Sequence, residues 1–341
     1  MRIILDAMGG DHAPSEIIKG GVKAAQDFDV DIIFVGKKEV IRQELERQQS
    51  KYSPSRIHIQ NADEVITNDD VPTKAVKAKK DSSMVFGLKM LKEKKGDAFI
   101  SAGNTGALLT GALLFVGRIS GVDRPALTPM IPTDKGCAVL VDAGANTNCK
   151  PEHFLQFGIM GSAYIKNVIG IENPRVGLVN IGTEEGKGTG LTKGSYALLE
   201  KAPVNFIGNI EAREIPSGDI DVIVCDGFVG NVILKLMEGM GLAFYKNIKE
   251  IFTKNPLTYL AALFVKSGLK MFKSKMDYME YGGAPLLGID GVVIKAHGSS
   301  NERAIYSAIR QAKKFVETGV IDDIREYISR TGEDIIESNE I

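Results

Sequence analysis

The chain has 341 residues, 44% hydrophobic and 25% charged, and can bury a large core as a single α/β domain over residues 1–341, or as two lobes. Its formal net charge of −1 at pH 7 excludes a general attraction to nucleic acid, so any charged partner must meet a local patch. Three cysteines, odd in number and without metal-ligand spacing, favour a reducing cytosol over a secreted disulfide scaffold.

The first residues form a strand-like run, Arg2-Ile3-Ile4-Leu5, rather than the charged and apolar regions of a signal peptide. No uncharged apolar run approaches the roughly 20 residues that span a bilayer. We therefore expect a cytoplasmic protein.

Short, β-branched apolar runs predict strands covered on both faces at 2–5, 32–35, 57–59, 98–100, 138–141, 176–179, 222–224 and 292–294. Between them, helical patterns occupy 15–25, 73–94, 106–116, 152–165, 191–200 and 301–317. This alternation predicts a doubly wound, mostly parallel, Rossmann-like α/β sheet.

Loops rich in Gly, Asn, Ser, Asp and Thr follow six of the apolar runs, at 6–11, 101–106, 142–146, 180–186, 226–231 and 297–301. If the strands are parallel, all six loops leave one edge of one sheet, where open α/β sheets bind ligands. Glycines permit close backbone approach, and helix N-termini offer unpaired N–H groups to anions. The pattern predicts an enzyme for an anionic, phosphorylated species.

Three of these loops carry candidate phosphate-binding groups. The first offers Gly9, Gly10, Asp11 and His12, although a tight strand-to-helix turn with a capping residue explains it equally well. Two more combine glycine with hydroxyl and amide donors at helix starts, and hydroxyl-rich caps without a ligand are the alternative there. Their candidate residues are Asn104, Thr105, Gly106, Ser299 and Ser300.

The loop at 182–190 resembles a nucleotide-binding loop but lacks both usual patterns. Residue 181 is Ile, Lys187 is followed by Gly188, and no Gly-x-Gly-x-x-Gly is present, so we expect no nucleotide cofactor. Lys187 can swing onto a phosphate or a developing oxyanion. The alternative is a solvated lysine on a mobile loop.

Histidine supplies the usual acid or base near neutral pH, and two of the four histidines, His12 and His297, lie in glycine-rich loops. We favour a site role for His297. His58 alternates like a strand residue and is expected to be structural, while His153 fits either role. Cys225, at a strand end, is a candidate nucleophile or a small buried thiol.

Residues 246–280 form a basic, amphipathic helical excursion from the α/β pattern. Its apolar and lysine residues suit either a hairpin that enters a membrane surface with anionic head groups, or a dimer interface or buried helix with a solvated lysine face. The residues that carry this choice are Leu260, Leu263, Phe264, Lys266 and Lys270.

Six motifs, in order along residues 2 to about 316, together resemble the bacterial PlsX family of acyl-acyl-carrier-protein:phosphate acyltransferases. They are Asp6-Ala7-Met8-Gly9-Gly10-Asp11-His12-Ala13-Pro14, Ser101-Ala102-Gly103-Asn104-Thr105-Gly106-Ala107, Asp142-Ala143-Gly144-Ala145-Asn146, Asn180-Ile181-Gly182-Thr183-Glu184-Glu185-Gly186-Lys187-Gly188, Cys225-Asp226-Gly227-Phe228-Val229-Gly230-Asn231 and Ala296-His297-Gly298-Ser299-Ser300.

The resemblance implies that orthophosphate attacks the thioester of a fatty acyl carrier protein, giving acyl phosphate for phospholipid synthesis. It also implies a fold akin to phosphotransacetylases and isopropylmalate dehydrogenases, and a homodimer. The product would pass to a membrane-bound glycerol-3-phosphate acyltransferase, which places the protein peripherally on the inner face of the membrane. The lysines of residues 246–280 then suit either the acidic carrier protein or the membrane surface, while Leu260, Leu263 and Phe264 suit mainly the membrane. No cofactor or metal is implied.

For this reaction we expect phosphate on Asn104, Thr105, Ser299 and Ser300, with Lys187 offsetting charge repulsion between phosphate and the oxyanion. The carrier thiol leaves as thiolate or is protonated by His297. Asn180, Asn231 and Asp226 orient these groups, and Asn146 with the first loop completes the substrate site.

Three rival functions remain open from the sequence. They are a short-chain phosphotransacetylase that uses coenzyme A, a related NAD-dependent decarboxylating dehydrogenase, and a non-catalytic membrane scaffold for lipid enzymes. The dehydrogenase is disfavoured because the chain lacks the arginine cluster such enzymes use for a dicarboxylate.

Overall fold

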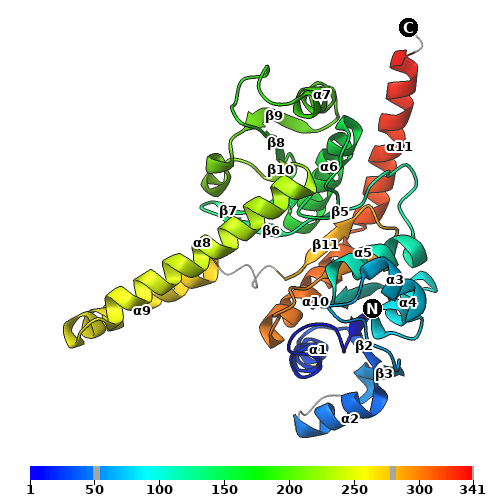
Figure 1. The fold of residues 1–341 in the computed structure, drawn as a ribbon, viewed down its shortest axis with the longest axis vertical. Coiled ribbons are helices and arrows are strands. Elements are labelled where there is room, and N and C mark those ends of the chain that lie inside the picture. The colour runs from blue at the N-terminus through cyan, green and yellow to red at the C-terminus, as the bar shows by residue number, and fades with distance from the viewer. Residues whose placement is uncertain (49–53, 277–281, 340–341) are drawn as a thin grey trace.

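A computed structural model describes residues 1–48, 54–276 and 282–339. The strands form two sheets rather than the single sheet that the loop pattern suggested (Figure 1). The larger has the order β3-β2-β1-β4-β12-β11-β5, with β1 (Arg2–Asp6), β2 (Asp31–Gly36), β3 (Ile57–Asn61), β4 (Ala98–Ser101), β5 (Ala126–Leu127), β11 (Ala284–Leu287) and β12 (Val292–Lys295). The smaller has the order β6-β7-β10-β8-β9, with β6 (Met130–Thr133), β7 (Gly136–Val141), β8 (Arg175–Val179), β9 (Asn205–Ile210) and β10 (Val222–Val224).

Most strand pairs are parallel, as the buried apolar runs predicted. The pairs β1–β2, β2–β3, β1–β4 and β4–β12 in the larger sheet, and β7–β10, β8–β10 and β8–β9 in the smaller, are all parallel. Only edge-side strands run antiparallel among the described residues: β11 against β12 and β5, and β6 against β7. The predicted α/β class, with a mostly parallel sheet, is confirmed.

Helices cover the sheets and connect the parallel strands. They are α1 (Ser15–Asp27), α2 (Lys38–Arg47), α3 (Pro72–Ala78), α4 (Ser83–Lys92), α5 (Thr105–Gly111), α6 (Pro151–Tyr164), α7 (Gly190–Leu199), α8 (Gly227–Thr253), α9 (Pro256–Met276), α10 (Glu302–Glu317) and α11 (Val320–Asn339). Four short helical segments accompany them: η1 (Pro54–Arg56), η2 (Ala112–Val116), η3 (Ile165–Ile169) and η4 (Ala212–Ser217).

The helix expected over 73–94 is interrupted. Lys79 leaves the helical conformation at the end of α3, and the Ser82 hydroxyl accepts a hydrogen bond from the Val85 N–H, which caps a new helix, α4. A serine oxygen at this position satisfies a backbone donor that would otherwise be unpaired. The apolar periodicity continues across the break, which is why it suggested one helix.

A continuous core joins the two sheets. One buried cluster contains Ile3 and Leu5 from the larger sheet together with Val139, Val176 and Val222 from the smaller. Between helices, the Gln311 amide donates a hydrogen bond of 2.7 Å to the buried Tyr164 hydroxyl. These contacts fix the position of one sheet relative to the other, and therefore of the loops at their ends.

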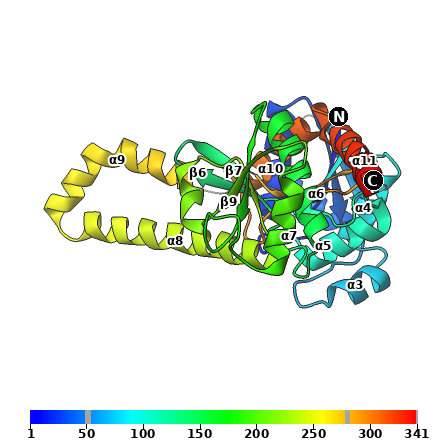
Figure 2. The same cartoon turned by 90° about the horizontal axis from the view of Figure 1, so that it is seen from above.

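Helices α8 and α9 pack against each other and project from the body of the molecule as a long hairpin (Figures 1 and 2). Much of its surface is apolar and exposed, including Leu242, Leu257 and Phe264, which are 70%, 80% and 88% exposed. By length and composition alone α8 resembles a membrane-spanning helix, with mean hydropathy 1.3 over its most apolar 18 residues. Its first turn is buried in the fold, however, through Gly227 and Gly230.

Candidate active site

The six polar loops gather in two groups of three, one group on each sheet. In the larger sheet they follow β1, β4 and β12, which are neighbours, and in the smaller they follow β7, β10 and β8, which are also neighbours. Parallel neighbouring strands bring their carboxyl ends to one edge, so the loops within each group lie close together. The predicted clustering of the loops is therefore found within each sheet. The prediction that all six loops leave one edge of a single sheet is wrong, because the strands belong to two sheets.

The loops of the first group are fastened to one another by hydrogen bonds. The Asp11 N–H donates to the Gly298 carbonyl at 2.8 Å, and the Ser101 hydroxyl donates to the buried Asp6 carboxylate at 2.7 Å. Gly9 must lack a side chain, because a Cβ there would lie 2.8 Å from the Gly103 nitrogen. The glycines of the first loop therefore serve close packing between loops.

In the second group a buried carboxylate organises the backbone. Asp142 accepts hydrogen bonds from the N–H groups of Leu127, Ala145 and Asn146 at 2.9, 3.1 and 2.6 Å. The Asn146 carbonyl in turn accepts from the Gly227 N–H at 2.7 Å, which ties this loop to the start of α8. Hydrogen bonds to Asp142 and Asn146 thus fix the backbone of the loops that follow β7 and β10.

A cavity of about 380 Å³ lies between the two groups of loops. Three residues predicted for the site line it: Thr105 and His297 from the larger sheet, and Asn231 from the smaller. Much of the remaining wall is apolar, formed by Leu127, Pro129, Met130, Phe228 and Leu234. The cleft therefore combines polar groups at the strand ends with an apolar surface.

His297 lines this cleft, and Ser299 holds its ring in place. Its Nδ1 accepts from the Ser299 N–H at 3.2 Å and lies 2.8 Å from the Ser299 hydroxyl oxygen. An Nδ1 that accepts leaves the proton on Nε2. Partial burial, and then the positive charge of Lys235, lower the pKa of His297, so the neutral form prevails at pH 7.

Lys295 is a site residue that the sequence analysis missed. It ends β12, lines the cleft beside His297, and is only 9% exposed. Its ammonium donates to the carbonyls of Ala102 and Ala296, which belong to two different loops of the first group. Burial lowers its pKa to about 8, while the carboxylates of Asp6 and Asp11 oppose the shift. The one available signal was a charged residue ending an apolar strand next to His297.

Replacing Lys295 with methionine is expected to change how stability depends on pH. Because the lysine pKa is about 8 when folded and near 10.4 when unfolded, the unfolded chain holds more protons between these values. The wild type should therefore gain stability over Lys295→Met as pH rises from about 8 to 10, by up to about 1.4 kcal/mol per pH unit. Urea unfolding at several pH values measures this gain.

The matched control is Lys74→Met, at an exposed position of α3. Its stability difference from wild type should stay constant with pH. If the stability difference between wild type and Lys295→Met is also constant with pH, burial does not lower the pKa of Lys295.

Among the predicted phosphate ligands, Ser300 has a buried hydroxyl that lacks a hydrogen-bond partner among the residues that the structure describes. The residue is 2% exposed. Buried polar atoms are nearly always satisfied, so this hydroxyl fits a bound ligand. Asn104 differs, because its Oδ1 caps α5 by accepting from the Ala107 N–H at 3.0 Å, and its Nδ2 donates to the carbonyls of Thr67 and Asn68.

The loop that carries Lys187 does not line the cavity. Asn180 holds this loop by donating to the Lys187 carbonyl at 3.2 Å and by accepting from the Ile181 N–H at 2.9 Å. The Lys187 ammonium lies 3.8 Å from a Glu184 carboxylate oxygen, and its side chain is 52% exposed. Lys187 must therefore swing to reach the cleft.

Several other predicted residues have structural roles or lie outside the cavity lining. Asp226 caps α8, accepting from the Val229 N–H at 2.8 Å. Asn146 closes its own loop, donating to the Pro125 carbonyl at 2.8 Å. The predicted residues of the first group of loops that do not line the cavity are Gly9, Gly10, Asp11, His12, Asn104, Gly106, Ser299 and Ser300.

Cys225 is a buried thiol rather than a nucleophile. It is 2% exposed, and burial raises its pKa well above the ordinary value, which keeps the sulfur protonated. His153, for which both roles were open, is also structural: its Nε2 lies 2.7 Å from the Asp123 carboxylate and its Nδ1 accepts from the Lys150 N–H.

Comparison with solved structures identifies the class of fold. A phosphotransacetylase from Streptococcus pyogenes aligns with a TM-score of 0.62 at 15% identity, covering 96% of this chain and 94% of that chain. A 4-hydroxythreonine-4-phosphate dehydrogenase from Klebsiella pneumoniae aligns with a TM-score of 0.55 at 14% identity, covering 93% and 99%. At these identities the likeness shows the fold alone, and it confirms the predicted resemblance of the fold to that of phosphotransacetylases.

The sequence itself then identifies the family. A family model described as "Fatty acid synthesis protein" matches residues 1–323. A relative from Alkaliphilus oremlandii (strain OhILAs), named phosphate acyltransferase, is 56% identical over 337 residues, covering 99% of this chain and 100% of the relative. The chain belongs to this family of enzymes, the phosphate acyltransferases, which confirms the family that the six motifs predicted.

Proposed function

We propose that this protein transfers the fatty acyl group of an acyl carrier protein thioester to orthophosphate, releasing acyl phosphate and free carrier thiol for phospholipid synthesis. The observation that carries the proposal is the cleft itself. Its lining combines the charged groups of Lys295, Lys235 and Glu238 with His297 and with apolar side chains. The unpartnered hydroxyl of Ser300 lies behind the lining, in the loop that carries His297. These surfaces suit an inorganic anion and an acyl thioester held side by side.

The chemistry needs positioning more than activation. A phosphate oxygen attacks the thioester carbon and forms a C–O bond, giving a tetrahedral oxyanion. The oxyanion then collapses, the C–S bond breaks, and sulfur leaves with the electron pair. Because a free thiol has a pKa near 8.5, the thiolate is an adequate leaving group without an acid catalyst.

Each polar group has a separate task in this reaction. The Lys295 ammonium and the Ser300 hydroxyl bind phosphate, and the Nε2–H of His297 donates to the oxyanion. The sequence leaves two routes open for the thiol, which are departure as thiolate and protonation by His297. A lowered pKa makes it a poor acid at pH 7, so we assign it the donor role instead. Lys187 approaches from the other sheet and offsets the negative charge of phosphate and oxyanion.

Acyl phosphate formation distinguishes the carrier-protein reaction from its rivals. With phosphate present, acyl-acyl carrier protein should give acyl phosphate, trapped as the hydroxamate with hydroxylamine, at a kcat/KM at least tenfold above that of the matched acyl-coenzyme A. A preference for short acyl-coenzyme A would instead indicate a phosphotransacetylase. Absence of product from both thioesters would leave only the scaffold function.

The α8–α9 hairpin is proposed to bind the inner membrane surface, where a membrane-bound glycerol-3-phosphate acyltransferase would use the acyl phosphate. Support comes from the exposed apolar residues Leu260 and Phe264, which lie on α9 together with the exposed Lys266. Apolar insertion and attraction to anionic head groups add together at such a surface. The side chains of Leu263 and Lys270, also predicted to make contact, lie outside the described residues.

Two substitutions separate membrane binding from carrier-protein binding. Leu260→Glu should lower sedimentation with anionic liposomes severalfold and leave turnover of acyl carrier protein unchanged, because an inserted carboxylate opposes burial in the acyl region. Lys266→Glu should lower sedimentation only when anionic lipid is present. If turnover falls and sedimentation does not, the hairpin binds the carrier protein. If neither changes, the apolar face instead belongs to the interface of the homodimer that we also propose.

A further inference from the structure

A second cavity, of about 530 Å³, adjoins the cleft on the far side of the 143–147 loop. The reaction proposed above does not use it. Arg118, Arg124 and the carboxylate of Asp123 line it together with Leu109, Leu113 and Ala145, and Pro125 and Asn146 also belong to the lining. It thus pairs positive charge with a small apolar surface.

Three chain segments pass from one cavity to the other, so the two are immediate neighbours. Thr105 lines the cleft, and Leu109, about one helical turn or 6 Å further along α5, lines the second cavity. Leu127 lines the cleft and Pro125 the second cavity. The 143–147 loop contributes residues to both. The two cavities therefore lie on either side of the 143–147 loop, which any ligand that uses both must cross.

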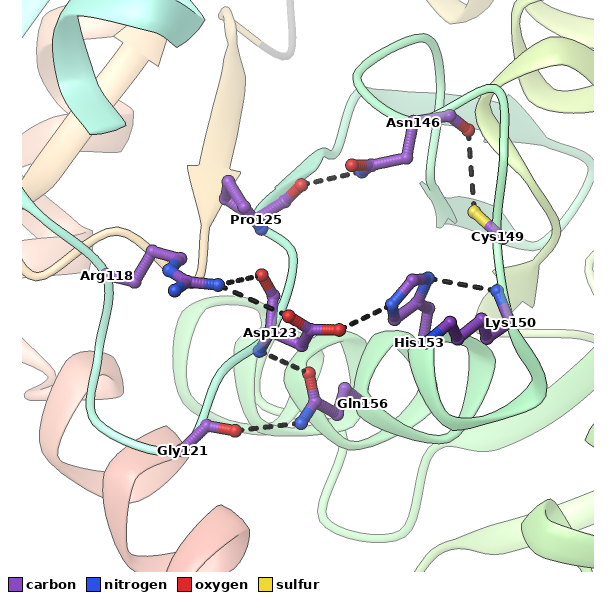
Figure 3. A network of polar contacts seen from close by, with 9 residues as sticks. All are labelled: Arg118, Gly121, Asp123, Pro125, Asn146, Cys149, Lys150, His153 and Gln156. Carbon is purple, nitrogen blue, oxygen red and sulfur yellow. Dashed lines mark hydrogen bonds and ion pairs between the residues drawn. The ribbon is translucent and has the colours of Figure 1, made fainter. Parts of the chain in front are cut away.

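The loop that carries the arginines is held in place by hydrogen bonds (Figure 3). Arg118 donates to the Asp123 carbonyl and lies 3.4 Å from one oxygen of its carboxylate. His153 contacts the other oxygen at 2.7 Å, and this contact is the main reason that the pKa of Asp123 is lowered. The Asp123 N–H donates to Gln156 at 2.9 Å. Arg118 is therefore positioned before any ligand arrives.

Arg124 lies next to this network and acts on Asp123 only through its charge. It makes no hydrogen bond or ion pair with any residue in the described part of the chain. His153 lowers the pKa of Asp123, whose carboxylate is the one negative group among the described residues of the lining beside two guanidinium groups, so positive charge exceeds negative charge there. The cavity therefore favours an anion, and a planar guanidinium suits a phosphate group.

We propose that the second cavity binds the phosphate-bearing end of a pantetheine arm, while the arm crosses the 143–147 loop and presents its thioester in the cleft. The inference rests on the proposed function, since a pantetheine thioester is the acyl donor. Arg124 and Arg118 bind the phosphate, and Leu109 and Leu113 contact the two methyl groups next to it. Carrier protein and coenzyme A share this arm, so the site recognises their common part.

Calorimetry with 4′-phosphopantetheine and with pantetheine tests the site without depending on turnover. The wild type should bind the phosphorylated compound about tenfold more tightly, equivalent to about 1.4 kcal/mol. Arg124→Ala should abolish most of this preference and leave pantetheine binding unchanged. Arg118→Lys, which keeps the charge but loses the planar fork, should reduce it. The matched control is Arg213→Ala, an exposed arginine on η4 whose partner is Glu211.

Kinetics with acyl-acyl carrier protein and acyl-coenzyme A complete the test. Arg124→Ala should raise KM for each active donor about tenfold with kcat unchanged, because the phosphate contact is the same before and during the reaction. An equal affinity of the wild type for the two pantetheines, or a preference that survives in Arg124→Ala, overturns the inference. If no thioester gives acyl phosphate although the preference for phosphopantetheine holds, the proposed function fails and the binding site stands.

Discussion

Lys187→Ala is expected to lower kcat for acyl phosphate formation by about 10²–10³-fold, the usual cost of removing one group that stabilises an oxyanion. Phosphate and the tetrahedral intermediate are both negative, and bringing them together requires compensating charge. Lys295 supplies part of it from the larger sheet. Lys187, on the opposite loop, is the candidate for the rest. Steady-state kinetics at saturating phosphate measure the change.

The position of Lys187 sharpens this expectation. Its ammonium is near Glu184 and outside the cavity lining, so it acts only after the loop has moved. Glu184→Gln, which releases the ammonium, should therefore leave kcat equal to or above that of the wild type. Lys193→Ala, on the exposed side of α7, is the matched control and should be near normal. A kcat for Lys187→Ala within twofold of wild type would show that the residue is a solvated surface lysine.

His297→Ala should likewise lower kcat by about 10²–10³-fold, through loss of the Nε2–H donor. His297→Gln places an amide donor near the same point and should recover at least tenfold of that loss. The contrast between the two variants separates a hydrogen-bond donor from an acid, since glutamine cannot protonate a thiolate.

The pH profile gives a second check on His297. Because its pKa is lowered, the neutral ring prevails at pH 7, and protonation at lower pH puts a proton on Nδ1. A protonated Nδ1 no longer accepts from the Ser299 N–H. The ring then loses the contact that holds it in place, so wild-type kcat should show an acid step at the lowered pKa, in addition to the titration of phosphate itself, and only this added step should be absent in His297→Gln. An unchanged acid limb in His297→Gln would contradict the assignment.

The elements and the loop chemistry could be predicted from the sequence because both depend on local patterns. Continuous β-branched runs such as 98–100 and 222–224 indicate buried parallel strands, and the glycine-rich loops after them are equally visible. The division into two sheets could not be predicted, since strand partners are set by long-range packing. The helix break at Ser82 was missed because apolar periodicity continues across it.

Of the residues that line the cleft, the sequence predicted Thr105, Asn231 and His297. The others were missed because their positions also depend on long-range packing. The composition of a loop shows which side chains are able to bind an anion. It does not show which of them already make hydrogen bonds within the fold. Asn104 and Asp226 are suitable donors and acceptors, and both cap helices instead. Lys295 was missed because a residue that ends an apolar strand shows no pattern of its own. Only the three-dimensional arrangement places its ammonium between two loops.

A single-turnover reaction tests the direct attack of phosphate most simply. Enzyme in excess is mixed with carrier protein bearing a radiolabelled acyl group and with phosphate, and the reaction is quenched in acid at short times. We predict that labelled acyl phosphate appears at the rate at which acyl carrier protein disappears, with no label on the enzyme. Label that passes first through the protein, or thioester consumed without acyl phosphate, would contradict phosphate attack in this cleft.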